Sequence, residues 1–446
     1  MSGVAPFFAS PMHKEILHRA WPIILSGLSV PLLGAVDTAV IGHLPDASYL
    51  GSVAIGAMIM SFLYWGFGFL RMGTTGFVAQ AAGANNAEEI RTVLVQSLML
   101  GFLISLIIFA LQIPVLKLAL HVVSSNVQVE QGASTYFNYR IWGAPAVLFN
   151  YTLLGFFIGI GNTRAALFTQ IFMNVVNITL DIIFVLWLGL EIQGVALASV
   201  IAEYSAVFIG FILVVKELKR LGGAWIKESI LSVSNAMKLL KVNLDIFIRT
   251  ILLIFSFAYF TAEAAKISEE ALAATAVLMN FMHFLAYGLD GFAHAAEGLV
   301  GAAIGAKKGD RLRQVVLVSS FWAFSVALLY SLIYWLFGVS AVNLLTDLEA
   351  VRNVAYTYLP WLILMPLVSV WSYQLDGIFV GAMQSKEMRN GMILSALGYF
   401  LAIYFLGDLW GMHGLWAALV IFMALRAGTL ALAYPRVKRA AMGAIG

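Results

Sequence analysis

Long apolar segments recur along the whole chain, and they limit what it can fold into more than any other feature. Most contain 20 residues or more, so each can cross a bilayer core about 30 Å thick as an α-helix. Only 11% of the residues are charged, against about 25% in soluble domains. We therefore expect an all-α integral membrane protein with twelve transmembrane helices, near residues 21–43, 50–80, 93–120, 135–161, 167–188, 194–215, 244–265, 272–304, 314–340, 355–382, 391–407 and 414–434.

The distribution of Lys and Arg predicts the orientation of these helices. Basic residues gather in both terminal tails and in alternate loops such as 216–241 and 307–313, whereas the opposite loops hold few. Because cytoplasmic loops are enriched in Lys and Arg, we expect both termini in the cytoplasm, in a multi-pass protein of the bacterial inner membrane. This placement explains the basic clusters without a nucleic-acid partner. The absence of cysteine excludes disulfides and cysteine-ligated metals.

The chain repeats itself at an offset of 222 residues. The segment from Leu50 aligns with that from Leu272, and the segment from Gly155 aligns with that from Gly377. Six helices plus six, both sets beginning on the cytoplasmic side, form a parallel repeat, which predicts a substrate route between the halves. The expected domains are an amino-terminal lobe, a charged cytoplasmic linker and a carboxyl-terminal lobe, in that order: 1–220, 221–243 and 244–446.

Acidic side chains lie inside these apolar segments, where a bilayer disfavours them. A carboxylate at mid-membrane costs roughly 2.5–3.5 kcal/mol, so such residues usually face a cavity on an ion or substrate path. The segment at Gly301 contains glycines and lysines but lacks the spacing of a phosphate-binding loop. We therefore expect a transporter driven by an ion gradient. We do not expect an enzyme, and we assign no catalytic residues. The six acids to be explained are Asp37, Asp181, Glu203, Asp290, Glu297 and Asp376.

Polar residues in the amino-terminal half follow one face of the predicted fifth helix. Spacings of 4, 3 and 4 place on one side of an α-helix the residues Gln170, Asn174, Asn177 and Asp181. The first helix carries a weaker stripe that ends at Asp37, and the sixth places Ser199 one turn from Glu203. If these faces converge, their oxygen atoms suit H+ or Na+ and offer no His or Cys to a transition metal. The alternative is that the amides and hydroxyls only tie helices together by hydrogen bonds.

The predicted eighth helix carries the longest polar stripe of the chain. Its spacings of 3, 4, 3, 4 and 3 keep to one side of a helix, and its members are Asn280, His283, Tyr287, Asp290, His294 and Glu297. A polar network of these residues with Asp376 has two interpretations, because it either couples ions or only fixes packing. Four arginines in or near the spans either neutralise the acids or reach toward lipid headgroups, namely Arg71, Arg140, Arg249 and Arg426.

Four segments carry a resemblance to a known family. They read PLLGAVDTAVIGHL at Pro31, RMGTTGFVAQAAGA at Arg71, LDGFAHAAEGLVGAAIGA at Leu289 and LDGIFVGAMQSKEMRN at Leu375. These segments resemble the DinF branch of the multidrug and toxic compound extrusion (MATE) transporters, and the resemblance covers nearly the whole chain. It implies twelve helices in two pseudo-symmetric six-helix lobes that form a V, and cation-coupled efflux of small organic, often cationic, compounds.

The resemblance also implies a cation site in the amino-terminal lobe. In the family this site uses an Asp of the first helix, an Asn and an Asp of the fifth, and a Thr of the sixth. The matching residues are Asp37, Asn177, Asp181 and Ser199, of which the last keeps the hydroxyl and lacks the methyl group. A proline associated with bending of the first helix matches Pro22. The other branch of the family places a Na+ site in the carboxyl-terminal lobe, but Asp376 lies about one turn from the corresponding position, so that site is not carried over.

The leading prediction is therefore a secondary active antiporter that exchanges a cation, H+ in preference to Na+, for organic compounds. It needs no cofactor beyond the coupling ion, binds no metal beyond Na+ at the four matched residues, and is expected to be monomeric in the lipid bilayer. The alternative is a flippase for lipid-linked oligosaccharides, from the same broader superfamily. A flippase should show a strongly basic cavity for pyrophosphate, whereas the charges within the spans here are mostly acidic.

Overall fold

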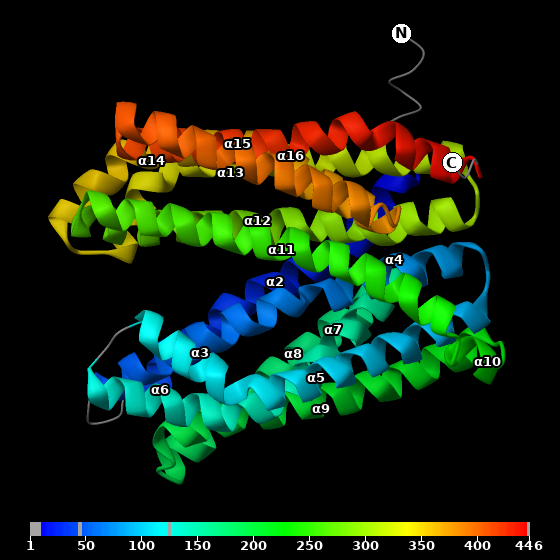
Figure 1. Ribbon diagram of the computed structural model, residues 1–446, viewed down its shortest axis with the longest axis horizontal. Helices are drawn as coiled ribbons and strands as arrows, with labels where there is room; N and C mark the ends of the chain where they lie inside the picture. Colours follow the sequence, from blue (N-terminus) through cyan, green and yellow to red (C-terminus); the bar gives the residue numbers. More distant parts are fainter. Residues whose placement is uncertain (1–9, 43–46, 124–125, 444–446) are drawn as a thin grey trace. The chain divides into compact units, whose positions relative to one another are not determined.

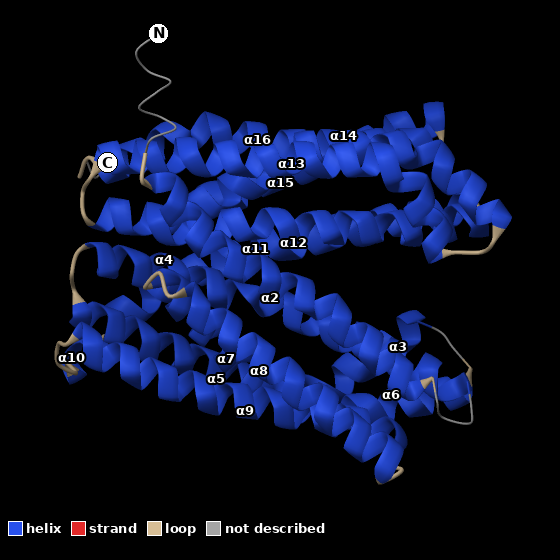
Figure 2. Cartoon of the chain, turned by 180° about the vertical axis from the view of Figure 1, so that it is seen from behind, coloured by secondary structure: helices blue, strands red, loops and turns tan. Residues whose placement is uncertain are grey.

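Helices joined by short loops make up the part of the chain that the computed structural model describes, residues 10–42, 47–123 and 126–443. Figure 2 shows helices and loops and no strand in these ranges, which confirms the predicted all-α class. Apolar side chains favour helices in a membrane because a helix satisfies every backbone hydrogen bond within one segment. Eleven helical segments of the described chain are long and apolar enough to span a membrane. They correspond to the second to twelfth predicted segments, and the first corresponds to α2.

Long helices follow one another along nearly the whole described chain (Figure 1). Their bounds are α2 (Met12–Ile41), α3 (Ala47–Trp65), α4 (Phe69–Gly83), α5 (Ala87–Val123), α6 (Val127–Arg140), α7 (Ala144–Gly159), α8 (Thr163–Asp181), α9 (Glu191–Leu221), α11 (Val233–Ile267), α12 (Glu269–Gly305), α13 (Gly309–Leu345), α14 (Glu349–Gly381), α15 (Ser385–Trp410) and α16 (Met412–Ala441). Side-chain caps start several of them. Asn162, for example, accepts a hydrogen bond from the backbone N–H of Ala165 at the start of α8 and so satisfies a free donor there.

The described chain divides into two compact units. The carboxyl unit contains the residues up to Ile24, Ala82–Asn85 and the residues from Val242 onward, and the amino unit contains Leu25–Ala81 and Asn86–Lys241. Helix α2 therefore contributes its first part to the carboxyl unit and its second part to the amino unit. The sequence-based division into two lobes and a linker over 221–243 stays a prediction.

Short irregular segments interrupt three spans of the amino unit. A 3₁₀ turn, η1 (Gly66–Gly68), separates α3 from α4, and a second, η2 (Ile141–Gly143), separates α6 from α7. A π-helical segment, η3 (Ile182–Trp187), follows α8. The segments of the second half that align with η1 and η2 lie within the continuous helices α12 and α14. The two halves of the repeat thus differ in backbone as well as in side chains. Two of the irregular segments lie beside acids of the amino unit, because η2 contains Gly143 next to Glu203 and η3 directly follows Asp181.

Close packing of α12 against α14 builds the carboxyl unit. A Cβ atom on Gly377 would lie 2.3 Å from the carbonyl oxygen of Ala293, and one on Gly381 would lie 2.4 Å from that of Glu297. Glycines spaced by four residues let two helix backbones approach closely, which is a common way to associate helices in membranes. This packing fixes the position of Asp376, which lies on α14 one residue before Gly377.

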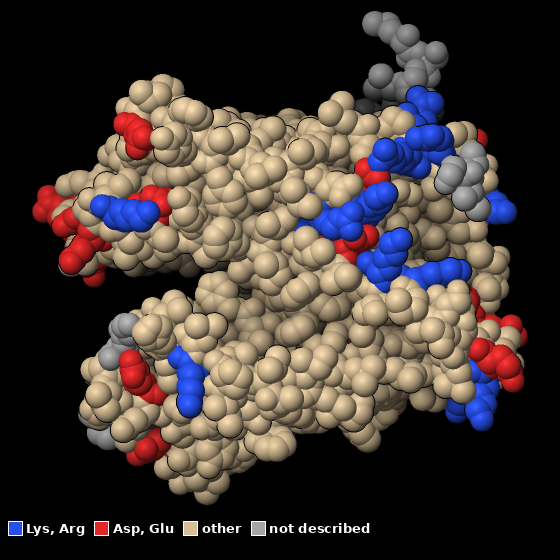
Figure 3. Space-filling model, in the orientation of Figure 1, with Lys and Arg blue, Asp and Glu red and all other residues tan. Residues whose placement is uncertain are grey.

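Charged side chains are unevenly distributed over the surface of the carboxyl unit. Figure 3 shows Lys and Arg gathered near the C-terminus and almost no charge in the middle of the visible face of this unit. Lys308, Arg436 and Lys438 are among the exposed basic residues of this region. An uncharged band beside a basic end is the pattern expected of a membrane protein with its cytoplasmic side rich in Lys and Arg.

Candidate cation-coupling site

Asp37 of α2 and Asp181 of α8 lie close together in the amino unit. Their carboxyl groups interact electrostatically with each other. The two carboxyl groups are close enough for a side-chain hydrogen bond when one of them is protonated, and both carboxyl oxygens of Asp181 and Oδ1 of Asp37 are buried without any other hydrogen-bond partner in the described chain. No ion pair joins either acid to a Lys or Arg within the described residues. A buried acid and a half-buried one that form no ion pair with a Lys or Arg are costly in lipid, which makes them candidates for binding a mobile cation.

The polar face of α8 contacts both neighbouring helices. Gln170 donates a hydrogen bond to Asn174 (3.0 Å), and Asn174 donates one to the hydroxyl of Ser29 on α2 (2.8 Å). Asn177, one turn before Asp181, lies 3.5 Å from the hydroxyl of Ser199 on α9. Asn174 therefore ties α8 to α2, and Gln170 supports it from the same helix. Asn177 and Ser199 lie on the side of α8 that also carries Asp181.

The local backbone changes directly after Asp181. The π-helical segment η3 begins at the next residue, Ile182, and such segments are frequent at functional sites because they redirect side chains within a helix. The four residues matched to the family site thus occupy three helices of one unit, and their side chains offer carboxyl, amide and hydroxyl oxygens. This donor set suits H+ or Na+. No cluster of three or more His, Cys, Asp or Glu side chains that could hold a metal occurs in the described ranges.

A second pair of charges lies in the same unit. Arg140, at the end of α6, donates from Nη1 to Oε2 of Glu203 on α9 at 2.7 Å and from Nη2 to Oε1. Both side chains are nearly buried, with 12% and 10% of their surface exposed. Glu203 also lies beside Asn150, which donates to its backbone carbonyl. Of the two roles left open for Arg140, the structure shows neutralisation of an acid rather than contact with headgroups.

The carboxyl unit contains an acid with two arginine partners. Arg249 of α11 and Arg426 of α16 both donate to the same oxygen, Oδ2, of Asp376 on α14, the second at 2.7 Å. The exposed fractions of the two arginine side chains are 9% and 4%. The sequence predicted that Asp376 joins the polar network of α12 from a facing helix, and this stays a prediction. Its hydrogen-bond partners in the described chain are the two arginines, because a full positive charge stabilises a buried carboxylate better than a histidine does.

The stripe on α12 is buried at one end only. Asn280 and His283 are exposed, and Asn280 donates to a carbonyl of its own helix. Glu297 is 2% exposed and lies 3.9 Å from Nε2 of His294, while the residues between, Tyr287 and Asp290, are half-buried. The sequence pattern placed these residues on one face correctly, but a face of this length passes through several environments. The stripe therefore does not form one continuous buried network.

Pro22, the proline matched to the bend of the first helix, lies in the first part of α2 and is buried.

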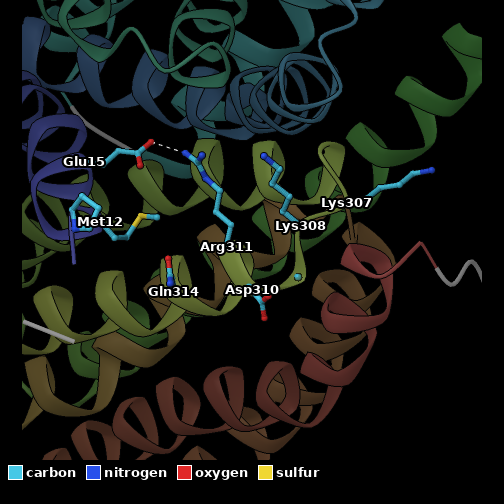
Figure 4. A pocket seen from close by; sticks show the side chains of 9 residues that line it. Met12, Glu15, Lys307, Lys308, Asp310, Arg311 and Gln314 are labelled. Atoms are coloured by element: carbon cyan, nitrogen blue, oxygen red, sulfur yellow. Dashed lines mark hydrogen bonds and ion pairs between the residues drawn. The ribbon is translucent and has the colours of Figure 1, made fainter. Parts of the chain in front are cut away.

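A separate cavity of about 630 Å³ lies at the end of the carboxyl unit, where α2 begins and α12 meets α13. Figure 4 shows Lys308 and Arg311 on its wall, with Arg311 directed toward Glu15 at 2.9 Å and Asp310 directed away. None of the six acids singled out in the sequence lines this cavity, so it is not the candidate cation site.

Sequence reasoning left open whether the arginines neutralise the acids, and it did not predict which arginine pairs with Glu203 and which with Asp376. The sequence signal was an arginine within an apolar segment, which needs a partner in lipid. Which acid it meets depends on helix packing, because Arg249 and Asp376 are 127 residues apart in the chain.

Comparison with known proteins decides the family. The MatE family model matches residues 22–183 and 246–407, one match in each half of the chain. The chain belongs to the MATE family. It is 42% identical over 431 residues to the DNA damage-inducible protein F of Escherichia coli K12, covering 96% of this chain and 93% of that protein. This match confirms the resemblance to the DinF branch.

More distant relatives agree. The chain is 25% identical over 442 residues to the probable multidrug resistance protein NorM of Bacillus cereus, covering 96% of both. Among solved structures, the Vibrio cholerae MATE transporter VcmN in its bent form matches with a TM-score of 0.85 at 20% identity, over 98% of this chain and 99% of that one. A transporter of the MOP superfamily from Pyrococcus furiosus matches with a TM-score of 0.86 at 19% identity, over 99% of both chains. These matches confirm the fold class.

Proposed function

We propose that this MATE protein is a secondary active multidrug exporter that exchanges a cation for organic compounds at Asp37 and Asp181. Membership of a family of multidrug transporters supports efflux as the activity. The observation that carries the assignment of the site is the pair of adjacent carboxyl groups without a Lys or Arg partner in the amino unit. A mobile cation is the partner that such a pair lacks.

We assign H+ as the coupling ion in preference to Na+. Two neighbouring carboxyl groups hold a shared proton without further ligands, whereas Na+ is a hard cation that needs a shell of oxygen ligands. The side chains of Asn177 and Ser199 already contact each other at 3.5 Å, which favours H+ over a Na+ ion that would need both as ligands. Each charge that moves inward across 100 mV releases about 2.3 kcal/mol, which is enough to shift a transporter with two conformations appreciably.

Transport follows from competition for the same acids. A cation that enters from outside neutralises Asp37 and Asp181, which favours release of the organic substrate, and loss of the cation to the cytoplasm restores the charge that attracts the next substrate. The substrates are small organic compounds, often cationic. The protein works as a monomer in the inner membrane, with both termini in the cytoplasm. A flippase for pyrophosphate-linked lipids is less well supported, because Arg140, Arg249 and Arg426 all donate to carboxylates.

Transport in proteoliposomes tests this function. The purified protein is reconstituted, a pH gradient or a Na+ gradient is imposed, and uptake of a fluorescent organic cation is followed. We expect uptake with the pH gradient, loss of uptake in Asp37→Asn and in Asp181→Asn, and no change in Asp408→Asn, which alters an exposed acid. Uptake by the first two variants at the wild-type rate would contradict the assignment of the site. Uptake with the Na+ gradient alone would contradict H+ as the coupling ion.

A further inference from the structure

We propose that Glu203 and Arg140 form a positioning pair for the coupling site, in which Glu203 holds the Arg140 guanidinium away from Asp37 and so keeps that acid open to a mobile cation. The proposal rests on the proposed function of Asp37 and adds two residues to it. Neither residue belongs to the four that the family resemblance matched to the cation site.

The side chains of Arg140 and Glu203 form a bidentate ion pair, which we call the clamp. Both guanidinium Nη atoms meet both oxygens of Glu203, a planar arrangement that fixes the direction as well as the strength of the contact. The ring of Tyr64 lies 5.6 Å from the guanidinium carbon on another side, within the range of a cation–π contact. The side chain of Arg140 is thereby held from two directions.

Gly143 in η2 makes this approach sterically feasible. A Cβ atom at this position would lie 2.5 Å from Oε2 of Glu203 and 2.8 Å from Nη1 of Arg140. The turn that separates α6 from α7 therefore does more than interrupt a helix, since it removes a side chain from the place where the two charges meet.

Two features connect the clamp to the coupling site, a shared helix and an electrostatic interaction. Glu203 lies one turn after Ser199 on the same helix, α9, and residues four apart share a helix face. Arg140 interacts electrostatically with Asp37, and the buried phenol of Tyr136 interacts with both. Arg140 is thus close enough to influence Asp37, although it is hydrogen-bonded to Glu203.

The charged groups around Asp37 can be named by element. Asp181 comes from α8, Arg140 from α6 and Glu203 from α9. The phenol of Tyr136 interacts with Asp37 and with the Arg140–Glu203 pair, and the phenols of Tyr64 and Tyr151 interact with that pair. All three phenols are uncharged near neutral pH. Since Arg140 and Glu203 cancel each other, the site keeps the charge of its two acids. Without Glu203, Arg140 is the tethered cation that pairs with Asp37, and a mobile cation has to compete with it.

The pH dependence of transport in proteoliposomes tests this arrangement. In Glu203→Gln the charge of Arg140 is no longer compensated, so Asp37 is protonated only at lower pH. An opposite charge within about 4–6 Å shifts a carboxyl titration by about 1–3 units, and we expect the midpoint of the transport profile to move to lower pH by about one unit. The double variant Arg140→Gln with Glu203→Gln removes both charges, and its midpoint should return toward the wild-type value.

A variant without any change of charge separates positioning from mere packing. Gly143→Ala inserts a methyl group between the two side chains and should move the midpoint in the same direction as Glu203→Gln, by a smaller amount. Gly101→Ala is the matched control in the same unit, because its Cβ would make ordinary contacts of 3.5 Å or more. We expect this control to keep the wild-type midpoint.

The outcomes separate this proposal from the proposed function. If Glu203→Gln and Gly143→Ala lower only the yield or the maximal rate and leave the midpoint unchanged, the pair is structural and the positioning role is wrong. Should Glu203→Gln fail to fold, an unchanged midpoint in Gly143→Ala refutes the proposal equally. Loss of coupled transport in Asp37→Asn tests the proposed function alone, because that variant leaves both residues of the clamp in place.

Discussion

Buried acids in the two units of this protein differ in their partners more than in their burial. In the amino unit, Asp181 is buried beside Asp37 and neither has an arginine partner in the described chain. In the carboxyl unit, Asp376 is 9% exposed and accepts hydrogen bonds from Arg249 and Arg426. An acid within a membrane span is thus not evidence of a coupling site by itself. The arrangement of the neighbouring cations decides whether the acid is open to a mobile ion.

The difference has an energetic basis. A buried carboxylate needs a compensating positive charge, and a tethered guanidinium supplies one permanently. A carboxylate without such a partner takes its compensating charge from the surroundings by binding a cation, and it loses that charge when the cation leaves. The Arg140–Glu203 pair shows that the amino unit also contains an arginine near its acids, but this arginine is bound to a third acid. Duplication therefore supplied two similar halves, and the placement of arginines gave them different chemistry.

The largest expected effect comes from removing the charge of the unpaired acids. Asp37→Asn should reduce gradient-driven accumulation of an organic cation in proteoliposomes to the level of protein-free liposomes, while the protein stays folded, because neutralising an unpaired charge in lipid removes a cost. Size-exclusion chromatography in detergent checks the fold. Coupled transport at the wild-type rate would show that Asp37 is no different from Asp376.

Removing the paired acid should act on stability. Asp376→Asn leaves two buried guanidinium groups without a carboxylate, and removing one partner of a buried ion pair costs about 3–5 kcal/mol. We expect a loss of this order in the free energy of unfolding, measured by denaturant titration in detergent. The protein that remains folded should still transport with an imposed gradient. Loss of coupling at unchanged stability would place a coupling ion in the carboxyl unit instead.

Removing one of the two arginines should have a smaller effect on stability. In Arg249→Met, Asp376 keeps its hydrogen bond from Arg426 at 2.7 Å, so the loss is that of one charged hydrogen bond, about 1.5–3 kcal/mol. The same unfolding measurement applies. If the loss were as large as that of Asp376→Asn, Arg426 alone would not compensate Asp376, and both arginines would be needed together.

The smallest effect is expected at the exposed end of the stripe on α12. Asn280→Ala removes a side chain that is exposed and bonded only to its own helix within the described residues, so stability should change by no more than about 0.5 kcal/mol. Transport should remain at the wild-type rate. A strong loss of transport at normal stability would reveal a function of this face that its exposure does not indicate.

The helical fold and the faces of the helices could be predicted from the sequence, because both depend on local patterns. Apolar length predicts a span, and spacings of three and four predicted that Asn177 and Asp181 share a face of α8. The position of Asp37 beside Asp181 required the family resemblance as well. The predicted span 135–161 contains the turn η2, which the apolar length alone did not predict. Gly143 ends this turn and Pro145 lies at the start of α7, and both residue types are common where a helix is interrupted.

The pairing of charges could not be predicted, because it depends on which helices pack together. Arg140 and Glu203 are 63 residues apart, and Arg249 and Asp376 are 127 apart. The sequence placed Asp376 in a polar network with the stripe on α12, whereas Arg249 of α11 and Arg426 of α16 are the residues that donate hydrogen bonds to it. A polar stripe predicts only that a face is polar, and the contacts of that face decide its function.

The most direct test of the contrast between the two units is the release of the coupling cation when substrate binds. Purified protein in weakly buffered detergent receives an organic cation, and proton release is followed with a pH-sensitive dye, with a Na+-selective electrode in parallel. We predict proton release from the wild type and from Asp376→Asn, and none from the double variant Asp37→Asn with Asp181→Asn. Release that persists in this double variant and disappears in Asp376→Asn would contradict the account.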